Sequence, residues 1–257
     1  MSRQFFIVGA QRCGTSYLHT VLDEHPEIEM AKPLAPEPKF FLRGDFASLK
    51  RSDYESRYFG HKPGATRWGE KSTSYMEYET AARRIAGWYG DAQLIFMLRH
   101  PAERAFSNYH FSRRNGLEDL PMSVAFAEED RRRDSYDRGK LSASPFAYLK
   151  RGHYMNDIRA YERHFGRSQL ILLIQEELVG DAGRIQDLYG TLGVKREFVP
   201  PSLRAVINSE SAVGEHPSPE VRDRLAGIFA ESIAELEDYM GREITAWRGQ
   251  PVARVAG

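Results

Sequence analysis

A short segment near the N-terminus, bracketed by two glycines, has the residue types and spacing of an anion-binding loop. Gly9 and Gly14 enclose four residues, which is the glycine spacing of a P-loop, G-x-x-x-x-G-K-[ST], but Thr15 stands where that motif has lysine. Apolar residues 5–8 precede the loop and a helical pattern follows it, so backbone N–H groups and a helix N-terminus should converge on one point. Such a point suits a phosphate or sulfate group. The structural alternative is a strand–turn–helix whose glycines only ease a tight connection.

The missing lysine changes which anion the loop is expected to bind. A P-loop lysine reaches the β- and γ-phosphates of a nucleoside triphosphate, so Thr15 at this position argues against an ATPase or a GTPase. Positive charge is supplied instead from inside the loop, by Arg12. We therefore expect an anion shorter than a triphosphate.

A second candidate anion site follows a strongly apolar run. Arg99 comes directly after residues 93–98, and Ser107 lies eight residues further on, about two helical turns into the next element. A guanidinium offers a planar fork that matches a phosphate, and a hydroxyl adds one hydrogen bond. An arginine after a strand is also an ordinary surface residue. Taken together with the first loop, the pair predicts a ligand with two separated anionic groups.

The elements that must position these residues alternate between strand and helix. Apolar runs predict strands over residues 5–9, 28–30, 93–98 and 170–174. Helical patterns cover residues 16–24, 81–88, 101–114, 121–133, 153–165, 181–192 and 219–239, while residues 43–68 read as short helices and loops. This order predicts a single α/β domain over residues 1–257, P-loop-like, with a central parallel sheet flanked by helices. Ligands of such sheets bind at the carboxyl ends of the strands, where Arg12 and Arg99 fall.

Composition sets the broad class. The chain has 257 residues, 41% hydrophobic and 28% charged, and its 36 basic side chains equal its 36 acidic ones. This balance gives no sign of nucleic-acid binding or of an anionic membrane partner. The single cysteine, Cys13, allows no internal disulfide, and no signal peptide or transmembrane run is visible, so we expect a cytoplasmic protein. The histidines show no metal-ligand spacing.

Several motifs resemble one known family. The segment from Gly9 to Leu18 is similar to the 5′-phosphosulfate loop of sulfotransferases that use 3′-phosphoadenosine 5′-phosphosulfate (PAPS), and residues 98–109 are similar to their 3′-phosphate element. The nearest branch is that of heparan sulfate sulfotransferases and their bacterial relatives. Glu37-Pro-Lys-Phe-Phe41 and Glu70-Lys-Ser-Thr-Ser-Tyr75 resemble two further motifs of that branch, as does Arg151-Gly-His-Tyr154. The likeness runs from residue 5 to about residue 192 and implies a PAPS-dependent sulfotransferase.

The resemblance also implies roles for single residues. Glu37 matches the catalytic base, and Arg12 stands where the family has a basic residue on the bridging oxygen of the phosphosulfate. Lys71 matches a lysine at the reacting centre that contacts either the sulfuryl group or the acceptor; Glu70 and Lys71 can also be read as plain surface charge. The implied donor-binding residues are Gln11, Arg12, Cys13, Gly14, Thr15, Ser16, Arg99 and Ser107. The product would be 3′,5′-ADP, and no metal is required.

Departures from the family pattern affect the edges of the site. Pro36 replaces the lysine before the base, although Lys32 could take its place, and Lys39 replaces a histidine. The basic loop that closes over the 3′-phosphate is missing from residues 211–217, where Arg204 or His216 could compensate. The arginines at 131–133 are read as a solvated helix face, with acceptor binding as the lesser alternative.

The predicted reaction is sulfuryl transfer from PAPS to a hydroxyl group, or less favourably an amine. A carbohydrate, lipid or small natural product are all open as acceptors, and the sequence does not indicate an oligomeric state. Two alternatives remain: a P-loop nucleotide kinase-like phosphotransferase, and a nucleotide-binding module without catalysis.

Overall fold

The computed structural model describes residues 3–137, 139–205 and 215–248. The chain divides into two compact units, which we call the sheet unit (Met1–Leu98 with Asp157–Asn208) and the helical unit (Arg99–Asn156 with Ser209–Gly257).

The sheet unit is built on five parallel strands in the order β2-β3-β1-β4-β5. The strands are β1 (Gln4–Gly9), β2 (Ile28–Met30), β3 (Arg67–Lys71), β4 (Gln93–Leu98) and β5 (Leu170–Ile174). All six residues of β1 are buried, and β1 lies between β3 and β4, so its apolar sequence matches its central place. The predicted α/β fold with a parallel sheet is confirmed.

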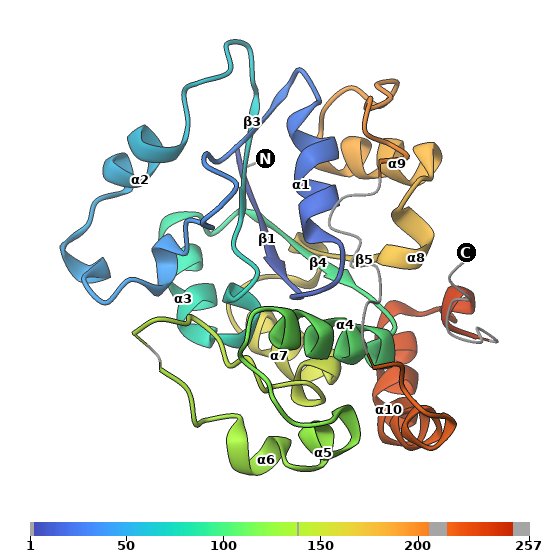
Figure 1. The fold of residues 1–257 in the computed structure, drawn as a ribbon. Helices are drawn as coiled ribbons and strands as arrows, with labels where there is room; N and C mark the ends of the chain where they lie inside the picture. Colours follow the sequence, from blue (N-terminus) through green and yellow to red (C-terminus); the bar gives the residue numbers. More distant parts are fainter. Residues whose placement is uncertain (1–2, 138, 206–214, 249–257) are drawn as a thin grey trace. The chain divides into compact units, whose positions relative to one another are not determined.

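The two faces of the sheet carry different side chains, because successive residues of a strand point to opposite faces. Phe5 and Ile7 of β1 belong to a core cluster with apolar residues of helices α1 and α9. Phe6 points the other way and packs against Phe41 and Tyr89, with ring centroids 5.5 Å and 5.8 Å apart. Figure 1 shows α1 turning back beside β1 after the connecting loop.

The helices of the sheet unit follow the predicted ranges closely, except for the short α8, which was not predicted. They are α1 (Thr15–Asp23), α2 (Arg51–Tyr58), α3 (Glu79–Trp88), α8 (Gln175–Leu178) and α9 (Ala182–Leu192), and the division between the units falls inside α7 (Tyr154–Glu162). Four single 3₁₀ turns complete the unit: η1 (Phe40–Leu42), η2 (Phe46–Ser48), η3 (Tyr75–Glu77) and η5 (Arg167–Gln169).

Strand β3 is the strand that was not predicted. Its sequence Arg67-Trp-Gly-Glu-Lys71 carries three charged residues, yet Glu70 is fully buried and Lys71 and Arg67 nearly so. Gly69 fits because a Cβ there would collide with the Phe5 ring and the Met30 sulfur. The charged residues and the glycine made this segment look unlike a buried strand in the sequence, although its charged side chains are buried within the unit.

The helical unit contains α4 (Pro101–Arg114), α5 (Met122–Ala127), α6 (Glu129–Arg132) and α10 (Pro219–Met240), with the 3₁₀ turns η4 (Lys150–Gly152) and η6 (Thr245–Trp247). Its core joins α4, α5 and α10 through apolar side chains that include Tyr109, Phe126 and Phe229. Pro101 stands at the first position of α4 and Gly241 ends α10, as helix boundary preferences lead one to expect. The single stretch predicted over 121–133 is two helices, because the chain breaks at Glu128.

Candidate functional site

The loop between β1 and α1 has the geometry of an anion cradle. Gly14 is the N-cap of α1 with φ 73°, and Arg12 also has a left-handed φ of 69°. Left-handed residues alternating with right-handed ones turn successive N–H groups toward the same point. No side chain of the described residues caps the α1 N-terminus, and no acidic residue occupies its first turn. The backbone is therefore suited to a phosphate or sulfate group.

The side chains of the loop divide into buried and half-buried ones. Cys13 is buried and its thiol hydrogen-bonds the Gln11 carbonyl, so it is a small residue that fits the turn. Gln11 donates its side-chain amide to Glu77 at 3.2 Å. Thr15 is 6% exposed, while Arg12 and Ser16 are half-buried. The structure thus brings the six predicted loop residues into one turn, and their contacts with a donor stay a prediction.

Glu37 and Lys71, predicted from separate motifs, lie side by side. The Lys71 ammonium is 2.9 Å from Glu37 Oε1. Thr73 donates its backbone N–H to Oε2 at 3.0 Å, and its hydroxyl lies 3.0 Å and 3.1 Å from the two carboxylate oxygens. The Glu37 and Lys71 side chains are only 16% and 7% exposed, and Glu70 is fully buried, so the interpretation of Glu70 and Lys71 as surface charge is wrong.

Among the described residues, the contacts of Glu37 leave its carboxylate free to accept one more hydrogen bond. A carboxylate offers about four lone-pair directions. The Lys71 ammonium, the Thr73 N–H and the single proton of the Thr73 hydroxyl fill three of them. One direction remains for an incoming hydroxyl group, and the other contacts fix the orientation of the carboxylate. Thr73 was not singled out from the sequence; its place two residues after Lys71 was the available signal.

Next to this pair, Glu70 points to the opposite face of the sheet. It is fully buried, and burial raises its pKa to about 7 although hydrogen bonds from three hydroxyl groups lower it. Its Cα pairs in register with that of Phe6 in β1. Glu70 therefore lies on the sheet face that Phe6, Phe41 and Tyr89 cover, which we call the aromatic layer, and not at the surface.

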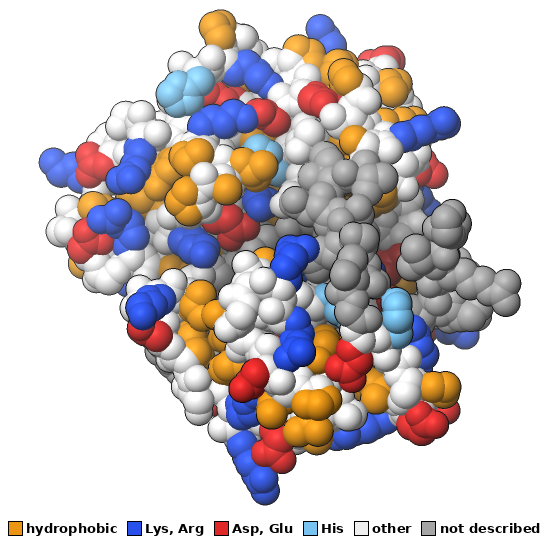
Figure 2. All heavy atoms as spheres, in the orientation of Figure 1, with side chains coloured by type: hydrophobic (Ala, Val, Ile, Leu, Met, Phe, Trp, Pro, Cys, Tyr) orange, Lys and Arg blue, Asp and Glu red, His pale blue; other side chains and the backbone are white. Residues whose placement is uncertain are grey.

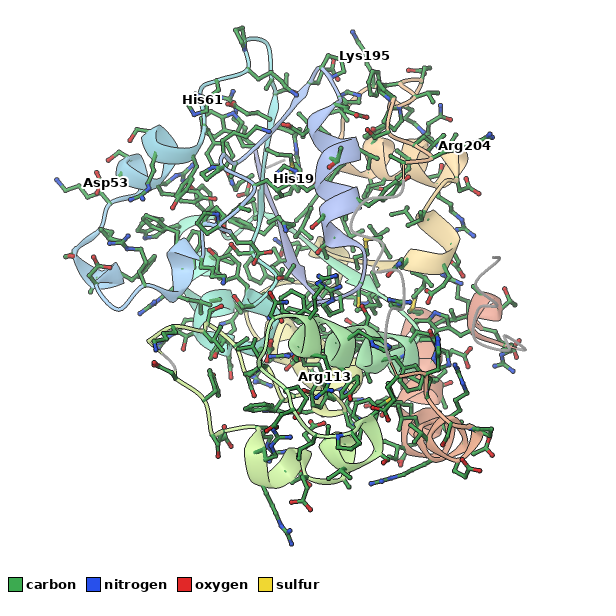
Figure 3. All side chains as sticks on the ribbon, in the orientation of Figure 1. His19, Asp53, His61, Arg113, Lys195 and Arg204 are labelled. Carbon is green, nitrogen blue, oxygen red and sulfur yellow. The ribbon has the colours of Figure 1, made fainter. Side chains whose placement is uncertain are left out.

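A buried histidine also lies near the pair. His19, labelled on α1 in Figure 3, is 3% exposed, and burial lowers its pKa to about 4. Asp23 raises this pKa, whereas the positive charges of Lys32 and Lys71 lower it further. Lys32 forms an ion pair with Asp23, so the idea that it replaces the missing lysine at position 36 finds no support. His19 was missed because one histidine within a helical pattern gives no functional signal.

Arg99 and Ser107 both belong to the helical unit. Arg99 lies 3.8 Å from Glu103, and its carbonyl accepts a 2.7 Å hydrogen bond from the Tyr154 hydroxyl. Ser107 is half-buried on α4. Glu103 also lies 3.7 Å from Arg222 of α10, so one carboxylate has a guanidinium on either side. Arg222 is a basic residue that sequence reasoning did not select, because it belongs to no motif.

The region expected to compensate for the missing basic loop is only partly described. Residues 211–214 lie outside the described residues. Glu215 accepts hydrogen bonds from the Tyr109 hydroxyl at 2.8 Å and the Met122 N–H at 3.0 Å, which ties it to α4 and α5. His216 is exposed, and so is Arg204, labelled in Figure 3. Neither has a contact that supports the predicted compensation.

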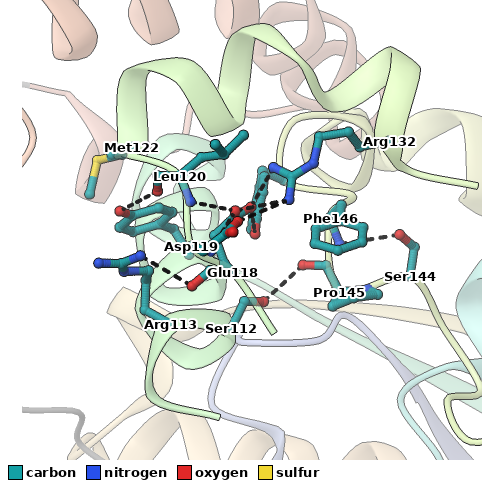
Figure 4. A network of polar contacts seen from close by, with 12 residues as sticks. Ser112, Arg113, Glu118, Asp119, Leu120, Met122, Arg132, Ser144, Pro145 and Phe146 are labelled. Atoms are coloured by element: carbon teal, nitrogen blue, oxygen red, sulfur yellow. Dashed lines mark hydrogen bonds and ion pairs between the residues drawn. The ribbon is translucent and has the colours of Figure 1, made fainter. Parts of the chain in front are cut away.

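The arginine triplet 131–133 is not uniformly solvated. Arg132 makes a two-pronged ion pair with the buried Glu118, at 2.9 Å and 3.0 Å, and lies over the Phe146 ring (Figure 4). Tyr148 donates to the same carboxylate at 2.8 Å. The expectation of a solvated face is therefore wrong for Arg132, which supports the core of the helical unit, while Arg131 is 82% exposed.

Within the residues that the structure describes, no group of histidine, cysteine and acidic side chains could hold a metal ion. No helix among them is long and apolar enough to cross a bilayer. On the face drawn in Figure 2, basic and acidic side chains are interspersed, in keeping with the zero formal net charge.

Comparisons with known proteins point to one family. The sulfotransferase domain family matches residues 2–208. Heparan sulfate glucosamine 3-O-sulfotransferase 6 of Mus musculus is 30% identical over 202 residues, which cover 75% of this chain and 53% of the relative. The bifunctional heparan sulfate N-deacetylase/N-sulfotransferase 2 of Bos taurus is 27% identical over 180 residues, 68% of this chain and 20% of the relative. The chain thus spans about half the length, or less, of these curated relatives.

Comparison with solved structures points to the same family. The crystal structure of a sulfotransferase from Alicyclobacillus acidocaldarius has a TM-score of 0.76 and 31% identity, covering 95% of this chain and 98% of that one. A mouse sulfotransferase, SULT7A1, complexed with PAP, shares the fold with a TM-score of 0.55 at 14% identity, over 94% of this chain and 88% of that one. With its parallel sheet, its P-loop-like turn and a family match over residues 2–208, this chain belongs to the sulfotransferase domain family of enzymes.

Proposed function

We propose that this protein transfers the sulfuryl group of PAPS to a hydroxyl group of a carbohydrate, lipid or small natural-product acceptor, with Glu37 as the general base. The single observation that carries the proposal is the held carboxylate: Lys71 and Thr73 fix Glu37 and leave one lone-pair direction open. The match to the sulfotransferase family supports PAPS as the donor.

The reaction needs three things from the chain. The acceptor oxygen must lose its proton as it attacks, which a carboxylate within hydrogen-bond reach can bring about. Negative charge develops on the oxygen that leaves with the nucleotide, and Arg12 together with the N–H groups before α1 is suited to stabilise it. Lys71 neutralises Glu37 before reaction, and its ammonium has further protons for a sulfuryl or acceptor oxygen.

The donor supplies an activated sulfuryl group. The cradle at Arg12–Gly14 has the backbone geometry to bind its 5′ end. Arg99 and Ser107 remain the residues predicted for the 3′-phosphate, and Arg222, which shares the Glu103 carboxylate with Arg99, is a further basic candidate. We expect no metal requirement, because sulfuryl transfer to a hydroxyl group can rest on these cationic and N–H groups.

A donor-exchange assay tests the class of reaction. The full chain is incubated with an acceptor panel and either radiolabelled PAPS or γ-labelled ATP, each with and without EDTA. We expect label transfer from PAPS alone, and the same rate with EDTA. Transfer from ATP, abolished by EDTA, would instead identify a phosphotransferase. Binding of 3′,5′-ADP without transfer to any acceptor would favour a nucleotide-binding module without catalysis.

A further inference from the structure

A fully buried carboxylate lies beside the proposed reacting pair and takes no part in the reaction described above. Glu70 accepts a hydrogen bond from the Ser72 hydroxyl at 2.6 Å and another from the Tyr54 hydroxyl at 2.7 Å. Tyr75 provides a third hydroxyl hydrogen bond. Three hydroxyl groups around one carboxyl group are a large concentration of polar contacts among packed aromatic rings.

Each of the three hydroxyl groups also accepts an N–H. Ser72 Oγ accepts the Lys39 backbone N–H at 2.9 Å, and the Tyr75 hydroxyl accepts the Phe41 backbone N–H at 3.1 Å. Tyr54 accepts the side-chain amide of Gln4 at 3.2 Å. A hydroxyl has one proton. Because an N–H approaches its oxygen, that proton is directed to Glu70, so the contacts form chains that run from N–H through O–H to the carboxylate.

Two of these chains end on the segment that carries Glu37. Lys39 and Phe41 lie two and four residues after Glu37, and Lys39 has a left-handed φ of 47°, a conformation that a non-glycine residue seldom adopts unless its surroundings hold it. The Glu37 side chain is meanwhile held by Lys71 and Thr73. Within residues 70–75, Lys71 and Thr73 therefore hold the Glu37 side chain, while Ser72 and Tyr75 hold the backbone that follows Glu37.

We propose that Glu70 is a positioning residue: through Ser72 and Tyr75 it fixes the backbone of residues 39–41 and so holds Glu37 in its reactive place. The inference rests on the proposed function, because a fixed position of Glu37 matters only if Glu37 takes part in the reaction. It differs from a role in catalysis, since Glu70 points to the opposite face of β3 and is fully buried.

The chemistry of the group favours such a role. Burying a carboxylate disfavours its charged form, and the buried site raises the pKa of Glu70 to about 7. An apolar side chain would fill a core position without that penalty. A neutral glutamine keeps the shape, but one of its two terminal atoms is an amide nitrogen, which donates and cannot accept, so at least one of the three hydroxyl groups loses its acceptor.

The test compares three variants in the full chain: Glu70→Gln, Tyr75→Phe and Tyr89→Phe. Tyr89 is the matched control, because its ring lies in the same aromatic layer near Phe41, whereas its hydroxyl bonds Glu55 at 3.0 Å. The readouts are kcat and KM for PAPS, and hydrogen exchange in the peptide that contains the Lys39 and Phe41 amides. We expect Glu70→Gln to lower kcat by about tenfold to a hundredfold with faster exchange of the Lys39 or the Phe41 amide, and Tyr75→Phe to lower it with faster exchange of the Phe41 amide. KM for PAPS should stay unchanged in both variants. Tyr89→Phe should leave all three near the wild-type values.

Two results would overturn the inference. One is a Glu70→Gln variant with unchanged exchange of the Lys39 and Phe41 amides or with unchanged kcat. The other is an equal loss of kcat in Tyr89→Phe, which would mean that any change in this group of packed rings lowers kcat. If Glu70→Gln does not fold, Glu70→Asp takes its place with the same readouts, because it keeps a carboxylate but shortens its reach toward Ser72 and Tyr75. Amide exchange needs no turnover, so failure of the proposed function, seen as no transfer from PAPS by the wild-type chain, is recorded separately from failure of the positioning role.

Discussion

At the scale of single residues, the charged side chains of the candidate site have hydrogen-bonding or ion-pair partners in the protein. Glu37 has Lys71 and Thr73, Glu70 has three hydroxyl groups, and Arg99 has Glu103. Sequence reasoning found Glu37 and Lys71 through a resemblance between motifs. It missed Thr73 and the depth at which Glu70 is buried, because both depend on how the loop after β3 folds back onto residues 37–41.

The pKa of His19 leads to a prediction about acid stability. An ordinary histidine titrates near 6.5, whereas His19 in the folded chain has a pKa of about 4. The unfolded state therefore binds a proton first as the pH falls, and stability that is present above pH 6.5 is lost down to about pH 4. The shift corresponds to about 3 kcal/mol.

Urea unfolding at pH 7 and pH 4.5 measures this effect. We expect the free energy of unfolding to fall by about 2–3 kcal/mol more for the wild-type chain than for His19→Gln, which lacks the titrating group. His61→Gln is the control, because His61 is exposed. An equal pH dependence in the wild-type chain and His19→Gln would contradict the assignment.

At the scale of elements, hydrophobic pattern was enough for β1, β4 and β5 and for the helices α1, α4 and α9, but it did not predict the short α8 directly after β5. It failed at β3, whose three charged residues and glycine look like a loop in sequence. The reason is physical. A strand that contributes to a site has polar side chains at its carboxyl end, and a hydrophobicity pattern cannot predict that polar side chains are buried together with hydrogen-bonding partners. The same charged residues, Glu70 and Lys71, are those that the site uses.

Gly69 gives a prediction about β3. Adding a methyl group there forces it against the Phe5 ring and the Met30 sulfur, so Gly69→Ala should lower the free energy of unfolding by about 1–3 kcal/mol. Gly87→Ala in α3 is the matched control: its new methyl group meets open space, and alanine favours helix over glycine by about 0.5–1 kcal/mol. Chemical denaturation of the two variants should therefore give changes of opposite sign. A Gly69→Ala variant with an unchanged free energy of unfolding would show that the space beside Gly69 accommodates a methyl group.

At the scale of the whole molecule, the sequence predicted the fold class and the family, and both are confirmed by the parallel sheet and by the family match. The organisation of residues 1–257 as one domain stays a prediction, and the identity of the acceptor stays open. The sequence could not single out one acceptor for a physical reason: the chain has no net charge, and its arginine triplet 131–133 is flanked by acidic residues on both sides.

The central claim is that the Glu37 carboxylate, held by Lys71 and Thr73, takes the acceptor proton during sulfuryl transfer. Its most direct test is the single-turnover rate of transfer from saturating PAPS in the wild-type chain, in Glu37→Gln and in Glu231→Gln, an exposed carboxylate of α10 that serves as the control. The account predicts that Glu37→Gln lowers the rate by about a hundredfold or more while its affinity for 3′,5′-ADP and the rate of Glu231→Gln stay unchanged. A Glu37→Gln variant that transfers sulfuryl groups as fast as the wild-type chain would contradict it.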